Sequence, residues 1–485
     1  MAIHNLGINS ILNVIRSSMS VIFPLITFPY ALRVLGAVNM GKVSYSLSII
    51  SYFSLLAKYG VSMYAVREGA KIRDNKNMFT EFSNNIFSIN LYFTILAYIL
   101  LTIALIFTPE LENYKIIILI QSVSLISGTI GIEWINTIYE DYLSVTLRSL
   151  LSYLIIIPSL FVFVKDSSDV VIYSIISMVS SSVVSIINWF YCKKYVKLRF
   201  ILFPNFRPHI KQLTIFFLNS VMITIYVNID VTMLGLINGD YSVGIYTTAT
   251  KIYEIIKSLL VSVYVVMIPR LSYFSSKRDY SSYNNLFSTV VGYALLLFIP
   301  ASIGLICVSD GVIYILGGFQ YTDSILPLQI LSIALVFAEF GGLITLCLNV
   351  TLGSERNNLV GSILGACSNF LLNFYFIPAY SYNGAAITTL ISELLVFLYC
   401  FKAINNKNKY INFRIIKTNF LQGMVGSALI IISTLIIRLI TQNIIYRTFA
   451  IVIVGALIYC AFLIIIKNEL VINFLNKTIY KLKNR

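Results

Sequence analysis

Long apolar runs alternate with short polar intervals along nearly all of the 485 residues. Each run has about the 20 residues that an α-helix needs to cross the hydrocarbon core of a bilayer. A transmembrane β-strand needs about half that length and alternates apolar with polar positions, so strands are excluded. The pattern therefore predicts an all-α polytopic membrane protein with about fourteen transmembrane helices. We expect them at residues 11–35, 41–63, 86–107, 114–134, 143–164, 170–191, 213–237, 244–268, 288–308, 325–350, 359–378, 384–403, 417–440 and 444–467.

Lysine and arginine concentrate in alternate intervals between these helices. With the N-terminus placed in the cytoplasm, most of the 35 basic residues fall in inner loops and the tail, at 67–76, 193–211, 270–278, 402–417 and 467–485. Cytoplasmic loops of membrane proteins are enriched in Lys and Arg, so we expect both termini to be cytoplasmic. Arg16 interrupts the first apolar run and no small-residue cleavage site follows it, so we expect this helix to stay attached.

The amino-acid composition excludes several classes of protein function. Charged residues make up 11% of the chain and hydrophobic residues 58%, so most of the surface must face lipid. The net charge of +15 is explained by the basic residues of the cytoplasmic loops, so it requires no nucleic-acid partner. Six dispersed cysteines without a C-x-x-C pair, and only two histidines, predict neither a disulfide framework nor a metal site. No cofactor is expected.

An internal similarity divides the chain. Residues 30–36, followed by Gly41, resemble residues 229–235, followed by Gly244, and each pattern begins a set of six predicted helices. Repeat-built transporters have this organisation. We expect an N-terminal lobe of helices one to six, a C-terminal lobe of helices seven to twelve, and two additional helices with a cytoplasmic tail. The corresponding residues are 1–200, 201–408 and 409–485.

The eighth predicted helix has the most informative charges. Lys251, Glu254 and Lys257 are spaced by three, which places them on one slowly drifting face. At 1.5 Å per residue from Gly244, Lys251 lies about 10 Å deep and Lys257 about 20 Å deep. Glu254 neutralises one lysine, so we interpret the other as a positive charge in a water-filled cavity that can hold a phosphate. The alternative is that these charges only pair and lock helix packing.

Carboxylates in other predicted helices complete the set of buried charges. Asp230 lies at about the depth of Lys251, so an ion pair between these two residues is geometrically reasonable. Glu339 and Glu393 lie deep in their helices, where they could couple ions or only hydrogen-bond a neighbour. The residues Arg16, Arg33, Lys58 and Arg148 lie near helix ends, where they are either interfacial anchors or site residues.

Nothing in the chain predicts catalysis. An enzyme that polymerises or ligates lipid-linked sugars needs a substantial outer loop with acid, base or arginine groups. The longest outer loop, about residues 309–324, has only Asp310 and Asp323. We therefore expect a transporter and not an enzyme.

Several motifs resemble those of the Wzx-type O-antigen flippases, which export polysaccharide repeat units. In the first half these are residues 23–30, 33–36 with Gly41, 59–60, 67–68, 133–140 and 146–148. In the second half they are Asp230 with 233–235, then 243–246, 269–272, 383–386 and 392–393. The family usually has a glycine where Ile138 stands, so the local turn is expected to differ.

This resemblance implies a fold, a cargo and a location. The fold is that of the multidrug/oligosaccharidyl-lipid/polysaccharide (MOP) exporters, which include the MATE transporters, with two lobes around a cavity that opens alternately to each side. The cargo is undecaprenyl diphosphate carrying an oligosaccharide repeat unit, moved from the cytoplasmic to the periplasmic face of a bacterial inner membrane. Membrane lipid and the polymerase and chain-length machinery of the same pathway are the implied partners. The resemblance assigns the anionic head to Lys257, Lys251 and Arg148, with Arg33 and Arg16 behind them.

Two other transport functions stay open. A cation-coupled exporter of drugs or metabolites with the same fold would favour an acidic cavity, which the lysines of the eighth helix argue against. A flippase for teichoic-acid or capsule units differs only in cargo. Asp230, Glu254, Glu339 and Glu393 are the candidates for charge pairing or ion coupling.

Overall fold

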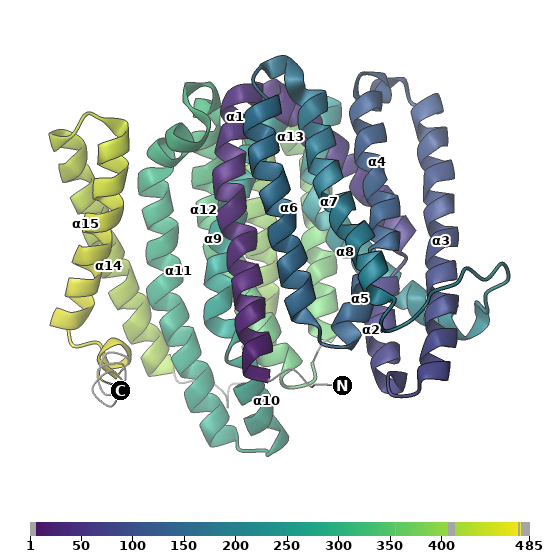
Figure 1. The fold of residues 1–485 in the computed structure, drawn as a ribbon. Coiled ribbons are helices and arrows are strands. Elements are labelled where there is room, and N and C mark those ends of the chain that lie inside the picture. Colours follow the sequence, from purple (N-terminus) through teal and green to yellow (C-terminus); the bar gives the residue numbers. More distant parts are fainter. Residues whose placement is uncertain (1–5, 355, 406–412, 474–475, 477–485) are drawn as a thin grey trace. The chain divides into compact units, whose positions relative to one another are not determined.

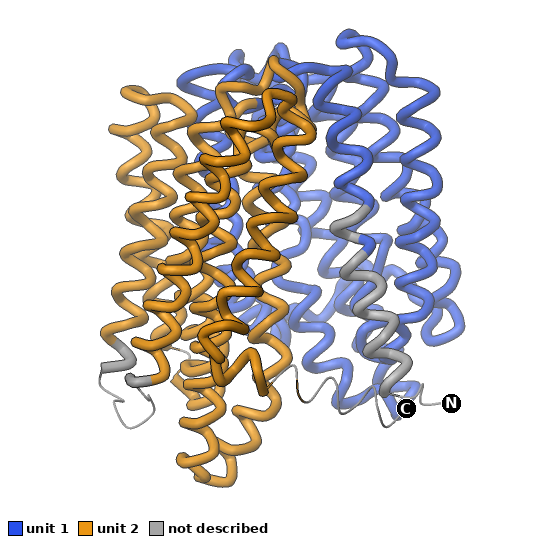
Figure 2. Tube along the Cα trace, turned by 90° about the vertical axis from the view of Figure 1, so that its left-hand side faces the viewer, with its two compact units in different colours: residues 1–244 blue, residues 245–485 orange. Residues whose placement is uncertain are grey.

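The computed structural model describes residues 6–354, 356–405, 413–473 and 476 (Figure 1). Every element in this part of the chain is helical, as the apolar runs predict. The chain divides into two compact units, residues 1–244 and 245–485 (Figure 2). Helix α8 (Arg207–Ile237) packs on α1 (Leu6–Lys58) within unit 1, so this division falls later than the predicted boundary at residue 200. The assignment of lobes from the sequence repeat stays a prediction.

Unit 1 contains the first eight α-helices, two 3₁₀ segments and the first turn of α9. In chain order these are α1 (Leu6–Lys58), α2 (Val61–Ile72), α3 (Lys76–Phe107), η1 (Pro109–Tyr114), α4 (Lys115–Ile130), α5 (Glu133–Ile138), α6 (Tyr142–Phe163), η2 (Ser167–Asp169), α7 (Val170–Cys192), α8 (Arg207–Ile237) and α9 (Asp240–Val265).

Unit 2 contains the rest of α9 and all later elements. They are α10 (Ile268–Ser276), α11 (Tyr280–Gly317), the 3₁₀ segment η3 (Phe319–Ser324), α12 (Ile325–Leu343), the π-helix η4 (Ile344–Val350), α13 (Arg356–Asn405), α14 (Phe413–Ile440) and α15 (Ile444–Ile465).

Twelve helical stretches in the described residues are long and apolar enough to cross a membrane. Two of them contain a backbone break. Gly36 interrupts α1 with φ 76°, and Ser381 interrupts α13 with φ 50°. On both sides of each break the helix has 20 residues or more, which is enough to span a bilayer. The structure therefore agrees with the expected number of about fourteen spans, and both breaks lie where the apolar pattern predicts a turn.

The two glycines of the internal similarity pack against each other's helices. A Cβ on Gly41 would collide with the carbonyl oxygen of Asp240, at the start of α9. A Cβ on Gly244 would collide with the carbonyl oxygen of Ala37 in α1. Small residues let membrane helices approach closely enough for backbone contact. The paired glycines therefore fix how the first turn of α9 lies on α1 within unit 1.

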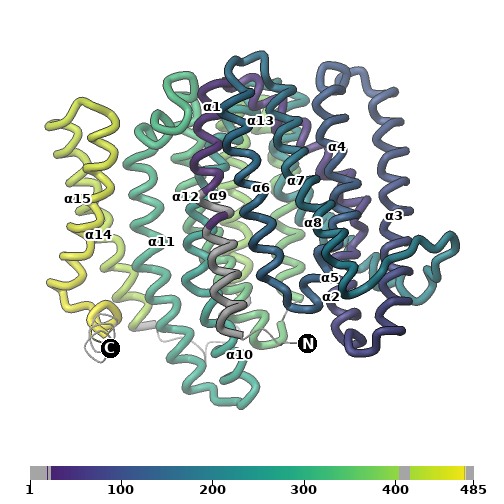
Figure 3. The backbone as a smooth tube through the Cα atoms, viewed as in Figure 1, coloured from purple at the N-terminus to yellow at the C-terminus, as the bar shows by residue number. Residues whose placement is uncertain are grey.

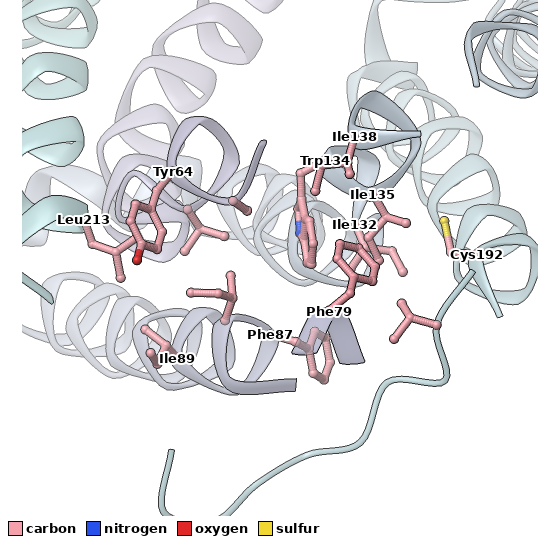
Figure 4. Close-up of a cluster of buried hydrophobic side chains, with 14 residues drawn as sticks. Tyr64, Phe79, Phe87, Ile89, Ile132, Trp134, Ile135, Ile138, Cys192 and Leu213 are labelled. Atoms are coloured by element: carbon pink, nitrogen blue, oxygen red, sulfur yellow. The ribbon is translucent and has the colours of Figure 1, made fainter. Parts of the chain in front are cut away.

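A buried aromatic and aliphatic cluster joins α2, α3 and α5 to the end of α7 (Figure 4). Trp134 and Ile138 enter it from α5, and Cys192 from α7. Ile138 lies in helix, directly over Gly69 of α2, where a Cβ would collide with its side chain. The left-handed residue of the following turn is Glu140, with φ 55°. Ile138 thus fills a space beside Gly69, and the turn needs no glycine at its position.

In unit 2, α14 and α15 pack on α11 (Figures 1 and 3). The Tyr459 hydroxyl donates to the carbonyl oxygen of Leu296 at 2.6 Å. Asp310 of α11 accepts from Arg438 of α14 at 3.3 Å and from Arg447 of α15 at 2.6 Å. These contacts anchor the additional helices predicted for residues 409–485.

Candidate functional site

Lys257 is the centre of a polar cluster in unit 2. Its ammonium lies 3.5 Å from the Glu393 carboxylate of α13 and donates to the Tyr253 hydroxyl at 3.4 Å. It also lies 5.4 Å from the centre of the Tyr253 ring. Glu393 is 7% exposed, so its charge has little access to solvent. In such surroundings an ion pair needs good geometry to offset the cost of removing both charges from water.

Glu339 places a second carboxylate near Lys257. This residue of α12 is fully buried, and neither oxygen makes a hydrogen bond of ordinary geometry within the described residues. Lys257, Glu393 and the Tyr264 hydroxyl are close enough to act on it electrostatically. The structure thus brings together three residues that the sequence indicated separately. One lysine faces two carboxylates here, so an anionic ligand has to compete with them for the ammonium.

Lys251 and Glu254 form the ion pair that their spacing predicts. The charged groups lie 3.7 Å apart on the surface of α9, with both side chains more than two-fifths exposed. Lys251 and Lys257 therefore each have a carboxylate partner, and the expected spare charge is not seen on either. Asp230 is buried in α8 of unit 1. Its pairing with Lys251 would join the two units and stays a prediction.

Arg148 forms a second candidate site, in unit 1. The side chain, on α6, is 6% exposed, and its guanidinium lies 5.3 Å from the centre of the Tyr191 ring at the end of α7. Both terminal nitrogens are buried without a hydrogen-bond partner among the described residues. Asp141 and Glu133 act on this charge only through space. A buried guanidinium with unused donors is suited to bind an oxyanion.

Asp141, which the sequence did not indicate, holds several side chains together at the N-terminal end of α6, near Arg148. Its carboxylate caps α6 by accepting from the Ser144 amide at 3.3 Å. It also accepts from Tyr191 at 2.6 Å, Tyr195 at 2.7 Å and Lys194 at 3.0 Å. Burial raises the pKa of Asp141, but these three side-chain hydrogen bonds outweigh burial and hold the pKa well below its usual value. The sequence pattern that could have indicated Asp141 is an Asp three residues before a Ser at the start of a helix, which is typical of a helix cap.

Arg33 lies exposed on α1, three residues before the break at Gly36. The side chain of Arg16 lies outside the described residues, although its backbone belongs to α1. The placement of Arg33 and Arg16 behind Arg148 therefore stays a prediction.

A large apolar cavity lies among α11, α12, α13 and α14 in unit 2. Its volume is about 710 Å³. Aromatic side chains, including Phe287, Phe337, Phe340, Phe397 and Phe420, form much of its lining. Within the described residues, no group of three or more His, Cys, Asp or Glu residues is placed to hold a metal ion.

Solved structures share this arrangement of helices. One described as "Lipid II flippase MurJ, inward closed conformation" superposes with a TM-score of 0.75 and 19% identity, over 95% of this chain and all of that one. An inward-facing multidrug resistance MATE family transporter of the MOP superfamily gives a TM-score of 0.59 and 15% identity, over 86% of this chain and 98% of the other. These likenesses define the class: a multi-pass membrane protein with the MOP fold, as predicted.

The family is defined by sequence. Residues 6–275, more than half of the chain, match the family described as polysaccharide biosynthesis protein, and the chain belongs to that family. The "Putative O-antigen transporter" of Escherichia coli (strain K12) is 25% identical over 386 residues, covering 77% of this chain and 91% of that protein. The protein of the same name in Shigella dysenteriae is 24% identical over 388 residues, covering 79% and 96%. The resemblance to Wzx-type flippases is confirmed.

Replacing Lys257 alone should destabilise the protein more than replacing Lys257 and Glu393 together. Lys257→Met leaves two buried carboxylates, and we expect a cost of about 2 kcal/mol, below the roughly 3–5 kcal/mol of a fully buried pair because Lys257 is a third exposed. Lys257→Met with Glu393→Leu should recover at least half of this loss. The free energy of unfolding in detergent micelles measures both effects. Lys251→Met, which breaks an exposed pair, is the matched control, at under about 1 kcal/mol. A double variant no more stable than Lys257→Met would contradict the pairing.

Acidification should remove the stabilisation that Asp141 provides. A carboxyl whose pKa is lowered by folding stabilises the protein above its unfolded pKa of about 3.9, and this contribution is lost as the pH falls toward the folded pKa. We expect Asp141→Asn to lower the midpoint of thermal unfolding at pH 7, and the gap from the unmodified protein to narrow below about pH 4. Asp74→Asn, at an exposed position, is the control. A gap that stays constant from pH 7 to pH 3 would show that the Asp141 charge is not the cause.

Proposed function

We propose that this chain is a flippase that moves an oligosaccharide repeat unit of O-antigen type, linked to undecaprenyl diphosphate, across a bacterial inner membrane. Movement runs from the cytoplasmic to the periplasmic face by alternating access. The observation that carries the proposal is membership of the polysaccharide biosynthesis family, together with relatives named as O-antigen transporters over most of their length. The flipped unit would then pass to the polymerase and chain-length machinery of the pathway.

The diphosphate head needs cationic donors, which we assign to Arg148, Lys251 and Lys257, with Arg33 and Arg16 behind them. Arg148 supports the assignment best, because its terminal nitrogens are buried without a partner in the described structure and a phosphate would supply the acceptors. Lys257 would exchange Glu393 for phosphate as the cargo binds.

The polyprenyl tail needs an apolar environment throughout the movement of its head. The cavity among α11 to α14 is lined by aliphatic and aromatic side chains with Ser302 as an exception, and its volume of about 710 Å³ suits a segment of isoprenoid chain. We place part of the tail there.

A cation-coupled exporter of drugs or metabolites is the second candidate. Its specific support is the excess of carboxylate around Lys257, where Glu339 and Glu393 face one ammonium. A cationic cargo would be attracted by that balance. In the flippase, the same two carboxylates, with Asp230 and Glu254, are the candidates for charge pairing or ion coupling.

Deletion of the gene, with the glycosyltransferases of the pathway intact, separates the candidates. The proposal predicts that an undecaprenyl-diphosphate oligosaccharide accumulates and that surface polysaccharide disappears, because the finished unit cannot leave the cytoplasmic face. Lipid extraction and mass spectrometry measure the intermediate, and its spectrum distinguishes O-antigen from capsule or teichoic-acid units. Restoring the gene on a plasmid is the control. Unchanged lipids with increased sensitivity to cationic drugs would favour the exporter.

A further inference from the structure

A polar pocket of about 330 Å³ lies in unit 1 between α8 and the junction of α1 with α2. Unlike the aromatic cavity of unit 2, it is lined largely by hydroxyl and amide side chains. The polar lining residues are Ser51, Ser54, Lys58, Ser62, Ser220, Thr224 and Asn228. Polar groups in this number are costly within a membrane protein unless they hydrogen-bond the backbone, water or a polar ligand. Its volume is at the lower end of the roughly 300–1,000 Å³ of ligand pockets.

The pocket has a rigid frame. Gly60, with φ 73°, joins α1 to α2, and a Cβ there would collide with the Leu213 carbonyl oxygen and with the backbone of Phe217 in α8. Tyr59 stacks on the Phe217 ring at 4.4 Å between ring centres, and its hydroxyl hydrogen-bonds Thr214 at 3.1 Å. The Tyr59-Gly60 motif therefore holds α8 against the α1–α2 junction, which forms the pocket.

Three neutral side chains of the pocket use a donor on the backbone of their own helix and keep an acceptor oxygen. Ser51 donates its hydroxyl hydrogen to the Ser48 carbonyl oxygen at 2.6 Å, and Ser220 donates to that of Phe216 at 3.0 Å. Each hydroxyl oxygen keeps lone pairs for another donor. The Asn228 amide donates to the Thr224 carbonyl oxygen at 3.0 Å, which leaves its own carbonyl oxygen as an acceptor. Sugar hydroxyls are donors of the kind that this lining requires.

Lys58 adds one positive charge to this neutral lining. Its ammonium makes no ion pair with a carboxylate of the described residues, unlike Lys251 and Lys257. The Cε atom lies 3.6 Å from the position of a Cβ on Gly128, so the side-chain stem passes along α4. An ammonium without a carboxylate next to hydroxyl acceptors is suited to a sugar that bears an anionic group.

We propose that this pocket binds the sugar joined directly to the carrier diphosphate, with Lys58 on the phosphate linked to the sugar and the Ser, Thr and Asn side chains on the sugar hydroxyls. The other phosphate is left to the residues assigned above. The pocket is too small for a whole repeat unit, so it selects the first sugar only. This inference rests on the proposed function and adds to it the residues that recognise the first sugar of the cargo.

Two variants with matched controls test the two halves of the pocket. Thr224→Val removes a hydroxyl and keeps the shape, and Lys58→Met removes the charge. Thr80→Val and Lys76→Met make the same changes elsewhere in unit 1, outside the pocket. The purified full-length chain is titrated in detergent with two probes: undecaprenyl diphosphate, and undecaprenyl diphosphate carrying one N-acetylglucosamine.

Thr224→Val should weaken binding of the sugar-bearing lipid about 3- to 10-fold and leave the bare lipid within about 2-fold, because only the former loses a hydrogen bond. Lys58→Met should weaken both about 10-fold or more, because both carry the phosphate. The proposed role of the pocket would be wrong if Thr224→Val weakened binding of both probes equally, or if Lys58→Met had no effect. In that case, binding of the probes by the unmodified chain would still support the flippase. Failure of the unmodified chain to bind either probe would overturn both.

Discussion

A charged side chain inside a membrane needs a counter-charge, hydrogen-bond partners or water, and this requirement organises both units. In unit 2, Lys257 is held between Glu393 and the Tyr253 hydroxyl, with Glu339 nearby. In unit 1, Arg148 lies against the Tyr191 ring with its terminal nitrogens unsatisfied in the described structure. A negatively charged head group could therefore replace Glu393 as the partner of Lys257. It could also supply the hydrogen-bond acceptors that Arg148 lacks in the described structure.

Close approach of helices through glycine is the second constraint in unit 1. The contact between Gly41 and Gly244 lets the start of α9 lie directly on α1, and Gly60 brings α8 against the α1–α2 junction. Without a hydrophobic driving force between helices in lipid, such small-residue contacts and interhelical hydrogen bonds carry much of the stability. The polar pocket at Lys58 exists because Gly60 permits that approach.

The features set by local sequence could be predicted. Hydropathy located the spans, including the breaks at Gly36 and Ser381, because the length of an apolar run depends only on neighbouring residues. The spacing of Lys251 and Glu254 gave their ion pair for the same reason. The partners of Lys257 could not be predicted, because Glu393 and Glu339 come from α13 and α12 and meet α9 only through tertiary packing. Asp141 was missed because its three side-chain donors follow about 50 residues later.

We propose that this chain by itself moves a lipid-linked oligosaccharide across a bilayer. The most direct measurement reconstitutes the purified protein in vesicles containing the lipid-linked oligosaccharide extracted from the deletion strain, and adds a membrane-impermeant glycosidase outside. In vesicles without protein, the glycans of the inner leaflet stay protected. With the protein, the account predicts that nearly all glycans become cleavable while the vesicles stay sealed. If the protected fraction is the same with and without the protein, the account is wrong.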